Sequence, residues 1–166
     1  MSILTWQKQS NIENSIKKYI DAQISSQSLQ LLNQEGVATT VSCEVGQKVN
    51  NDWNLPIIQV YTDSKISTRL EIGSNNRLKD YLVIIECRTL LSGQERNLGE
   101  WLEDTLENGV TYYEYSVTVG DPDNPTETDS GHIRFDFLSS NSVSLGDDVD
   151  LFDKYRYRTT IRCSIS

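Results

Sequence analysis

Residues 81–109 read YLVIIECRTLLSGQERNLGEWLEDTLENG, and this stretch decides the fold class. Its first ten residues alternate, so that Tyr81, Val83, Ile85 and Cys87 share one face of a long strand. Apolar residues also occupy the opposite face at the start of this strand, which is typical of a central strand with one end covered on both sides.

The second half of the stretch predicts a helix over about residues 93–108. Ser92 and Glu95 match the Ser-x-x-Glu capping box, in which each side chain satisfies a free amide at the helix start. Asn108 and Gly109 supply a left-handed stop at the end. The buried stripe of this helix is formed by Leu98, Trp101, Leu102 and Leu106.

Upstream of this stretch, a first helix is predicted by apolar residues that recur every three or four positions. The helix starts either at Ser10, which with Glu13 matches another capping box, or at residues before Ser10. Gly36 marks the end of the helical region. The stripe consists of Ile12, Ile16, Tyr19, Ile20 and Ile24. The segments between the two helices that read as strands are Val37–Cys43, Leu55–Tyr61 and Thr68–Ile72.

Downstream, three strands are predicted over Val110–Val119, Ile133–Phe137 and Tyr155–Ile165, and the last has the cleanest alternation in the chain. These elements predict an α+β fold in a single domain of residues 1–166. Its sheet is mostly antiparallel, with the N-terminal helix and the second helix packed on it. The strongest core candidates are Ile16, Ile20, Ile85, Leu98, Trp101, Leu102, Leu106, Phe135 and Ile161.

Two long acidic segments, residues 120–131 and 139–150, read as loops. They are rich in Gly, Pro, Ser, Asn and Asp and have little to bury, so we expect them to be mobile in the free protein and ordered only by a neighbour. Neither segment follows the EF-hand pattern. The absence of this pattern favours solvated loops over calcium sites. The acidic residues that we expect at a subunit interface are Asp121, Asp123, Asp147 and Asp148.

The chain is acidic and otherwise ordinary in composition. Its 166 residues include 24 acidic and 15 basic ones, which gives a net charge of −9. Hydrophobic residues make up 37% and charged residues 23%, the composition of a folded domain rather than of a disordered chain. The charge argues against a general binder of nucleic acid or of anionic membranes, since phosphate contacts need clustered lysines and arginines.

The sequence holds no constellation typical of catalysis. His132 is the only histidine, and no Gly-x-Ser-x-Gly, P-loop or Gly-x-Gly-x-x-Gly motif occurs. Cys43, Cys87 and Cys163 lack the C-x-x-C spacing of zinc and redox sites. We therefore expect no enzyme activity, no metal and no cofactor, and three reduced, largely buried thiols.

A basic stripe stands out against the acidic background. Arg156, Arg158 and Arg162 share one face of the last predicted strand. This face is either solvated, or it pairs with acidic groups of this chain or of a neighbouring subunit. We name the three arginines, with the acidic residues above, as candidate interface residues.

Two features of the sequence bear on the cellular location. No apolar run approaches the roughly 18 residues that span a bilayer, and residues 1–8 lack a signal-peptide core. We expect a protein that is made in the cytoplasm, stays there until it joins an assembly, and has no membrane partner.

The order of the predicted elements, from about Ile12 to Ile165, resembles the tail-terminator (tail-completion) and related neck proteins of long-tailed bacteriophages. The segments that carry this resemblance after the first helix are Leu55–Val60, Glu71–Gly73, Tyr81–Glu86, Ser92–Arg96 and Leu106–Gly109. The two long acidic segments have no counterpart in that pattern.

The resemblance implies a non-enzymatic virion protein that forms a homo-oligomeric ring, usually a hexamer. Such a ring caps the tail tube protein and meets the head-side connector protein, and DNA passes through its lumen without specific binding. The alternatives are another neck or tail subunit (a stopper, adaptor or tube protein), a non-viral cytoplasmic binding module, and a metal-dependent hydrolase that uses the acidic segments.

Overall fold

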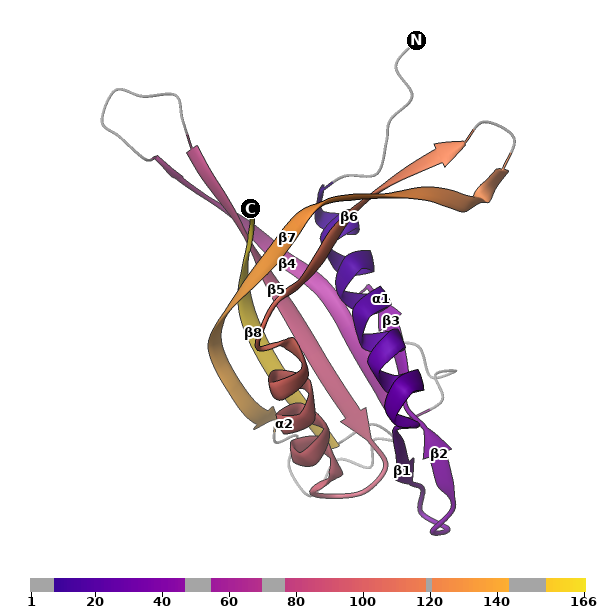
Figure 1. The fold of residues 1–166 in the computed structure, drawn as a ribbon. Coiled ribbons are helices and arrows are strands. Elements are labelled where there is room, and N and C mark those ends of the chain that lie inside the picture. The colour runs from indigo at the N-terminus through magenta and orange to yellow at the C-terminus, as the bar shows by residue number, and fades with distance from the viewer. Residues whose placement is uncertain (1–7, 47–54, 70–76, 119–120, 144–154) are drawn as a thin grey trace.

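The computed structural model describes residues 8–46, 55–69, 77–118, 121–143 and 155–166 (Figure 1). Its two helices and mostly antiparallel sheet confirm the predicted α+β class. The elements follow in the order α1 (Lys8–Gln27), β1 (Gln30–Leu32), β2 (Ala38–Thr40), β3 (Ser42–Val45), β4 (Ile57–Arg69), β5 (Arg77–Thr89), α2 (Gln94–Leu106), β6 (Val110–Thr118), β7 (Asp121–Val143) and β8 (Tyr155–Ile165).

Six of these strands form one sheet in the order β3-β4-β5-β8-β7-β6, and β1 and β2 pair separately. β3 and β4 are parallel, whereas every other neighbouring pair is antiparallel. β5 lies between β4 and β8, which confirms its prediction as a central strand. β8, the strand with the cleanest alternation, also lies inside the sheet.

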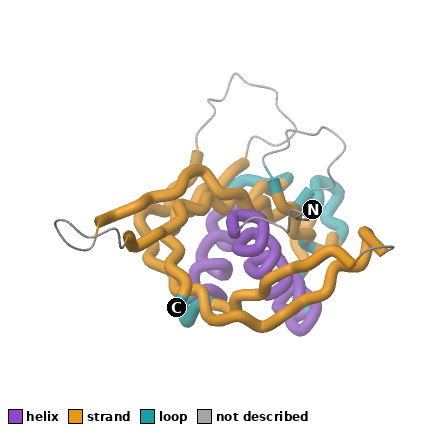
Figure 2. Tube along the Cα trace, turned by 90° about the horizontal axis from the view of Figure 1, so that it is seen from above, coloured by secondary structure: helices purple, strands orange, loops and turns teal. Residues whose placement is uncertain are grey.

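The sheet curls around both helices, as the view from above shows (Figure 2). α2 packs on β8, β5 and β7, while α1 packs on β6, β3 and β4. Extra residues at Asp63 in β4 and at Ser130 and Leu138 in β7 shift the strand register. Such bulges bend a strand and increase its twist, which helps the sheet to curl.

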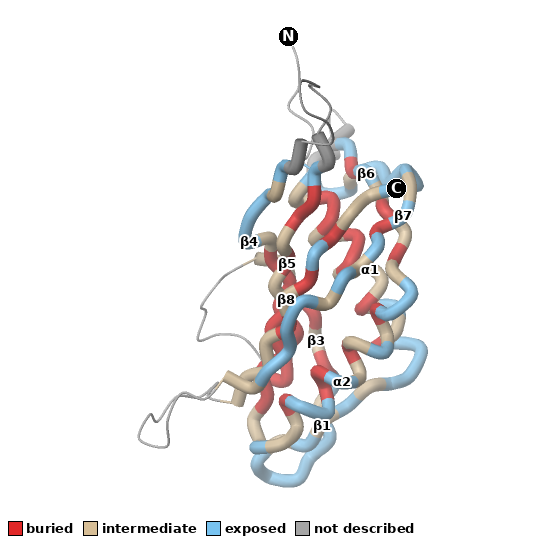
Figure 3. Tube along the Cα trace, turned by 90° about the vertical axis from the view of Figure 1, so that its left-hand side faces the viewer, coloured by how far each residue is buried: buried red, intermediate tan, exposed pale blue. Residues whose placement is uncertain are grey.

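The core fills the space between the helices and the inner face of the sheet. Buried residues follow the middle of β4 and β5 in particular (Figure 3). Trp101 and Phe135 are only partly buried and pack at the margin of the core. The other predicted core residues are buried, namely Ile16, Ile20, Ile85, Leu98, Leu102, Leu106 and Ile161. α2 approaches β8 so closely that a Cβ on Gly99 would lie 2.2 Å from the ring of Tyr157.

Polar side chains of α1 bind the backbone of the edge strand β6. The Tyr113 amide donates a hydrogen bond to Ser15 Oγ (2.9 Å), and the Tyr115 amide donates one to Asn11 Oδ1 (3.3 Å). Asn11 and Ser15 are both buried. The helix thus takes the place of a neighbouring strand, because it satisfies amides that an open sheet edge would leave unpaired.

The same helix also binds the opposite edge of the sheet. The Thr62 amide of β4 donates to Glu13 Oε1 (2.7 Å), and Lys17 Nζ donates to the Cys43 carbonyl of β3 (2.5 Å). α1 therefore closes the curled sheet by bridging its first and last strands.

Replacing Asn11 and Ser15 together by alanine is expected to lower the free energy of unfolding by about 1–3 kcal/mol, because two buried amides lose their acceptors. Urea denaturation followed by circular dichroism measures the change. Ser25→Ala, at an exposed position of the same helix, is the matched control. A loss no larger than that of the control would mean that α1 does not stabilise the β6 edge.

The predicted start of α2 and the predicted end of α1 were wrong, whereas the left-handed stop after α2 is confirmed, since Gly109 has φ 76°. α2 begins at Gln94 after Gly93, which has φ 89° and no side-chain capping bond, so Ser92 and Glu95 form no capping box. A left-handed N-cap residue of this kind favours glycine. In α1, Ser10 lies inside the helix, because the helix includes Lys8–Gln27. The helix also ends well before Gly36, which lies in the turn between β1 and β2.

The predicted acidic loops were also wrong where the structure describes them. Residues 121–131 and 139–143 belong to the single long strand β7. The prediction had assigned these residues to two loops on either side of a short strand. Asp121, residues 126–129 and Gly131 pair with β6, whereas residues 122–125 lie at a register shift, and β8 joins only from Ile133 onward. Pro122 and Pro125 lie within this irregularity, where the ladder needs no amide donor from them. Likewise, the predicted strand at Thr68 is the end of β4.

Candidate assembly surfaces

The predicted arginine stripe lies on the outer face of β8, away from the helices. Arg162 is exposed and stands opposite Asp136 of β7 in the strand register. Arg156 is half-buried and stands opposite Arg88 of β5. Arg158 binds a carboxylate of its own chain, so this part of the stripe follows the intramolecular alternative that the sequence had left open.

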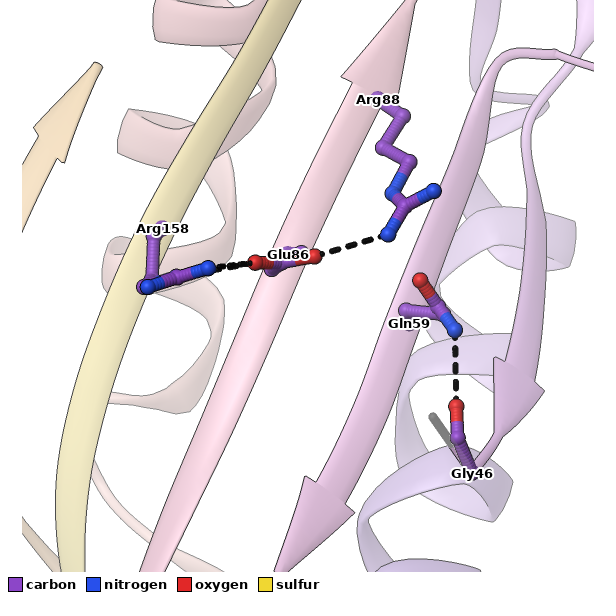
Figure 4. A network of polar contacts seen from close by, with 5 residues as sticks. All are labelled: Gly46, Gln59, Glu86, Arg88 and Arg158. Atoms are coloured by element: carbon purple, nitrogen blue, oxygen red, sulfur yellow. Dashed lines mark hydrogen bonds and ion pairs between the residues drawn. The ribbon is translucent and has the colours of Figure 1, made fainter. Parts of the chain in front are cut away.

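Glu86 is the centre of a buried ion-pair network on this outer face (Figure 4). Arg158 Nη2 lies 2.5 Å from Glu86 Oε1, and Arg88 Nη2 lies 3.0 Å from Oε2. The side chain of Glu86 is 3% exposed and that of Arg88 is 7% exposed, whereas Arg158 is 43% exposed. In the same row of the sheet, the buried Gln59 donates to the Gly46 carbonyl at 2.8 Å.

The network shifts the ionisation of its members. Burial alone would raise the pKa of Glu86, but hydrogen bonds from Arg158 and Arg88 outweigh it and hold that pKa below the ordinary value. The hydrogen bond with Glu86 in turn raises the pKa of Arg158. Glu86 and Arg158 therefore stay charged at neutral pH and, together with Arg88, form a structural ion-pair network within the subunit.

Two β-hairpins extend beyond the rest of the sheet. β8 lies between β5 and β7 and pairs with both. Its pairing stops at its C-terminal end, where Cys163 pairs with Tyr81 of β5 and Ile165 pairs with Ile133 of β7. Beyond this end, β4 and β5 continue as one ribbon, and β6 and β7 continue as another. The two ribbons leave the same end of the sheet and diverge to opposite sides (Figures 1 and 2).

The first ribbon, here called the basic hairpin, comprises residues 64–69 of β4 and 77–79 of β5. It contains four basic residues and no acidic one. At its root, Asp80 is buried, and the sequence places Glu71 between its two strands. Lys65 and Lys79 are exposed, and Lys65 Nζ lies over the ring of Tyr81, 6.0 Å from its centroid.

The second ribbon, here called the acidic hairpin, comprises residues 113–118 of β6 and 121–130 of β7. It contains five acidic residues and no basic one. Glu127 forms an ion pair with Lys18 of α1, whose ammonium group lies 3.9 Å from the Tyr113 ring centroid. Glu114 and Asp123 are exposed. The predicted interface residues Asp121 and Asp123 thus lie on this strand.

Asp147 and Asp148, the other predicted acidic interface residues, lie outside the described residues. The structure therefore brings together part of the predicted set on one hairpin and leaves Arg156, Arg158 and Arg162 on a different surface.

A pocket of about 350 Å³ lies at the root of the basic hairpin, beside the start of α1. Its lining includes Lys8 and Gln9 of the helix and Lys65, Lys79 and Tyr81 of the hairpin. Sequence reasoning missed this lysine pocket because its residues are far apart along the chain. The available signal was the concentration of positive charge in the sequence on both sides of residues 70–76.

The histidine and the three cysteines of the chain all lie among the described residues. His132 is exposed in β7, and its Nε2 lies 3.1 Å from the Asn108 carbonyl oxygen. Burial raises the pKa values of the Cys43, Cys87 and Cys163 thiols, which keeps them protonated and weakly nucleophilic at neutral pH. These described residues contain no cluster of His, Cys, Asp and Glu that could hold a metal ion. No described helix is long and apolar enough to cross a membrane.

No protein-family model matches the chain, and no curated protein matches it.

Proposed function

We propose that this chain is a structural subunit of a phage neck, which forms a homo-oligomeric ring that ends the tail tube and joins the tail to the head connector. The pair of oppositely charged hairpins carries this proposal. Two-stranded ribbons are marginally stable on their own and bury little apolar surface. Such ribbons are most useful as contacts with neighbouring subunits.

The charges of the hairpins favour a head-to-tail arrangement. A subunit that presents a basic surface on one side and an acidic surface on the other matches the next copy rather than itself, and repetition of that contact gives a ring when the rotation closes. Charge complementarity of this kind sets register and encounter rate more than affinity. Exposed ion pairs contribute only about 0–1 kcal/mol each, so apolar contacts supply the remaining stability.

The virion role rests on the resemblance of the sequence to tail-terminator and neck proteins. In that role the chain is not an enzyme, is made in the host cytoplasm and ends in the virion. An acidic ring suits the passage of DNA, since like charges keep the duplex from binding to the wall. A stopper, adaptor or tube subunit of the same particle would use the same hairpins, because the fold alone does not fix the role.

Native mass spectrometry and negative-stain electron microscopy of the purified chain test the ring. We expect closed rings, most often with six times the subunit mass of 18.9 kDa. Mixed with purified tail tubes, these rings are expected to bind one end of each tube. A chain that stays monomeric at every concentration, or that binds along the whole tube, would contradict the proposal.

A further inference from the structure

We propose that the lysine pocket is the docking site for the acidic hairpin of a second copy of this chain. The inference rests on the proposed ring and names the contact that builds it. The pocket supplies a concentrated positive charge, since Lys8, Lys65 and Lys79 converge on one volume. The described ion pairs of the chain include none with these three lysines.

Three ammonium groups around one pocket repel each other, and a bound anion removes that cost. The acidic hairpin has the complementary chemistry. Glu114 and Asp123 are exposed on it, and no basic residue shares its two strands. Carboxylates on an extended strand therefore match the pocket in charge.

The proposed occupant is the acidic hairpin of another copy. The two hairpins leave the sheet on opposite sides, so each can meet a different neighbour (Figures 1 and 2). The contact is therefore heterologous, and each copy donates its hairpin to one neighbour and receives a hairpin from the other. The root of the acidic hairpin is held against α1 by the Lys18–Glu127 ion pair, which fixes the direction in which it projects.

A charge-swap experiment tests this contact. Variant A carries Lys65→Glu and Lys79→Glu, and variant B carries Glu114→Lys and Asp123→Lys. Each variant alone presents like charges at the contact, so we expect its assembly to weaken at least about tenfold. An equal mixture restores opposite charges at every contact when A and B alternate. We therefore expect the mixture to assemble, and only into rings with an even number of subunits.

The matched control is the double variant Arg96→Glu and Arg134→Glu. Both arginines are exposed, and the control changes the net charge by the same amount as variant A. Circular dichroism first shows that each variant is folded, and mass photometry then gives the distribution of assemblies. We expect the control to assemble like the wild type.

The remaining outcomes distinguish failure of the docking site from failure of the ring. If the wild type forms rings and variant A forms them equally well, or if only the arginine control fails to assemble, the docking site is overturned and the proposed ring stands. Chains or dimers that depend on Lys65 and Lys79 but never close support the docking site and overturn the ring. Lysine-dependent binding of inorganic phosphate or short duplex DNA, with assembly unchanged in variant A, overturns the docking site in favour of a phosphate ligand.

Discussion

Replacing Glu86 by glutamine is expected to lower the free energy of unfolding at pH 7 by about 3–5 kcal/mol, the usual cost of removing one partner from a buried ion pair. The reason is that Arg88, at 7% exposure, loses a carboxylate 3.0 Å away while its own charge remains buried. Arg158 contributes less to the loss, because its side chain is 43% exposed and water can solvate it.

The effect of Glu86→Gln is expected to depend on pH. The pKa of Glu86 is lowered in the folded state, so its ionised form stabilises the fold. This contribution is complete above the pKa of about 4.3 that glutamate has in an unfolded chain, and it is lost as the pH falls through the lower folded-state value. The stability difference between wild type and variant should therefore shrink below about pH 4.

Urea denaturation at a series of pH values measures this difference. Glu100→Gln is the control, because Glu100 is exposed on α2. If Glu86→Gln and Glu100→Gln behaved alike at pH 7, the network would contribute nothing to the stability of the subunit. A difference that grew at acid pH would contradict the sign of the pKa shift.

Replacing Leu102 by alanine is the second substitution with a large expected effect. Leu102 is 0% exposed on the face of α2 that packs against the sheet, and truncation of such a leucine removes buried methyl groups and leaves a cavity. We expect a loss of about 2–5 kcal/mol in the free energy of unfolding. With a urea dependence of about 1–3 kcal/mol per molar, the midpoint should fall by roughly 1–2 M.

The control for this substitution is Asp104→Ala, at an exposed position of the same helix. Alanine favours the helix slightly over aspartate, so the control should be neutral or mildly stabilising. A loss under about 0.5 kcal/mol for Leu102→Ala would be typical of a surface position and would contradict the packing of α2.

The parts of the fold that the sequence predicted are those with strong periodicity. The alternation in β5 and β8 and the stripe of α2 reflect burial of one face, which is what packing against a core requires. Helix ends depended on weaker signals. At the start of α2, the left-handed Gly93 stands where a capping box was predicted. In α1, Asn11 and Ser15 lie one turn apart beside Ile12 and Ile16, and periodicity alone does not show that they bind the backbone of β6.

The acidic part of β7 was misread because its composition is that of a loop. Strand pairing is set by the neighbouring backbone as well as by side-chain propensity, and β6 pairs with Asp121 and with residues 126–129 despite their loop-like composition. The candidate surfaces were therefore predicted only in part. Asp121 and Asp123 were identified, but the opposing lysine pocket depends on the long-range approach of α1 to β4 and β5, which no local pattern encodes.

The closure of the sheet by α1 also constrains how the chain reaches its native state. Ser15 is 98 residues from its partner Tyr113, so the helix is synthesised long before the strand that it must bind. At about 5–20 residues per second, the ribosome leaves α1 without that partner for roughly 5–20 s. During this interval the stripe of Ile12, Ile16 and Ile20 has no complete core to cover it. We therefore expect nascent chains truncated before β6 to bind chaperones, and closure of the sheet to be among the last steps of folding.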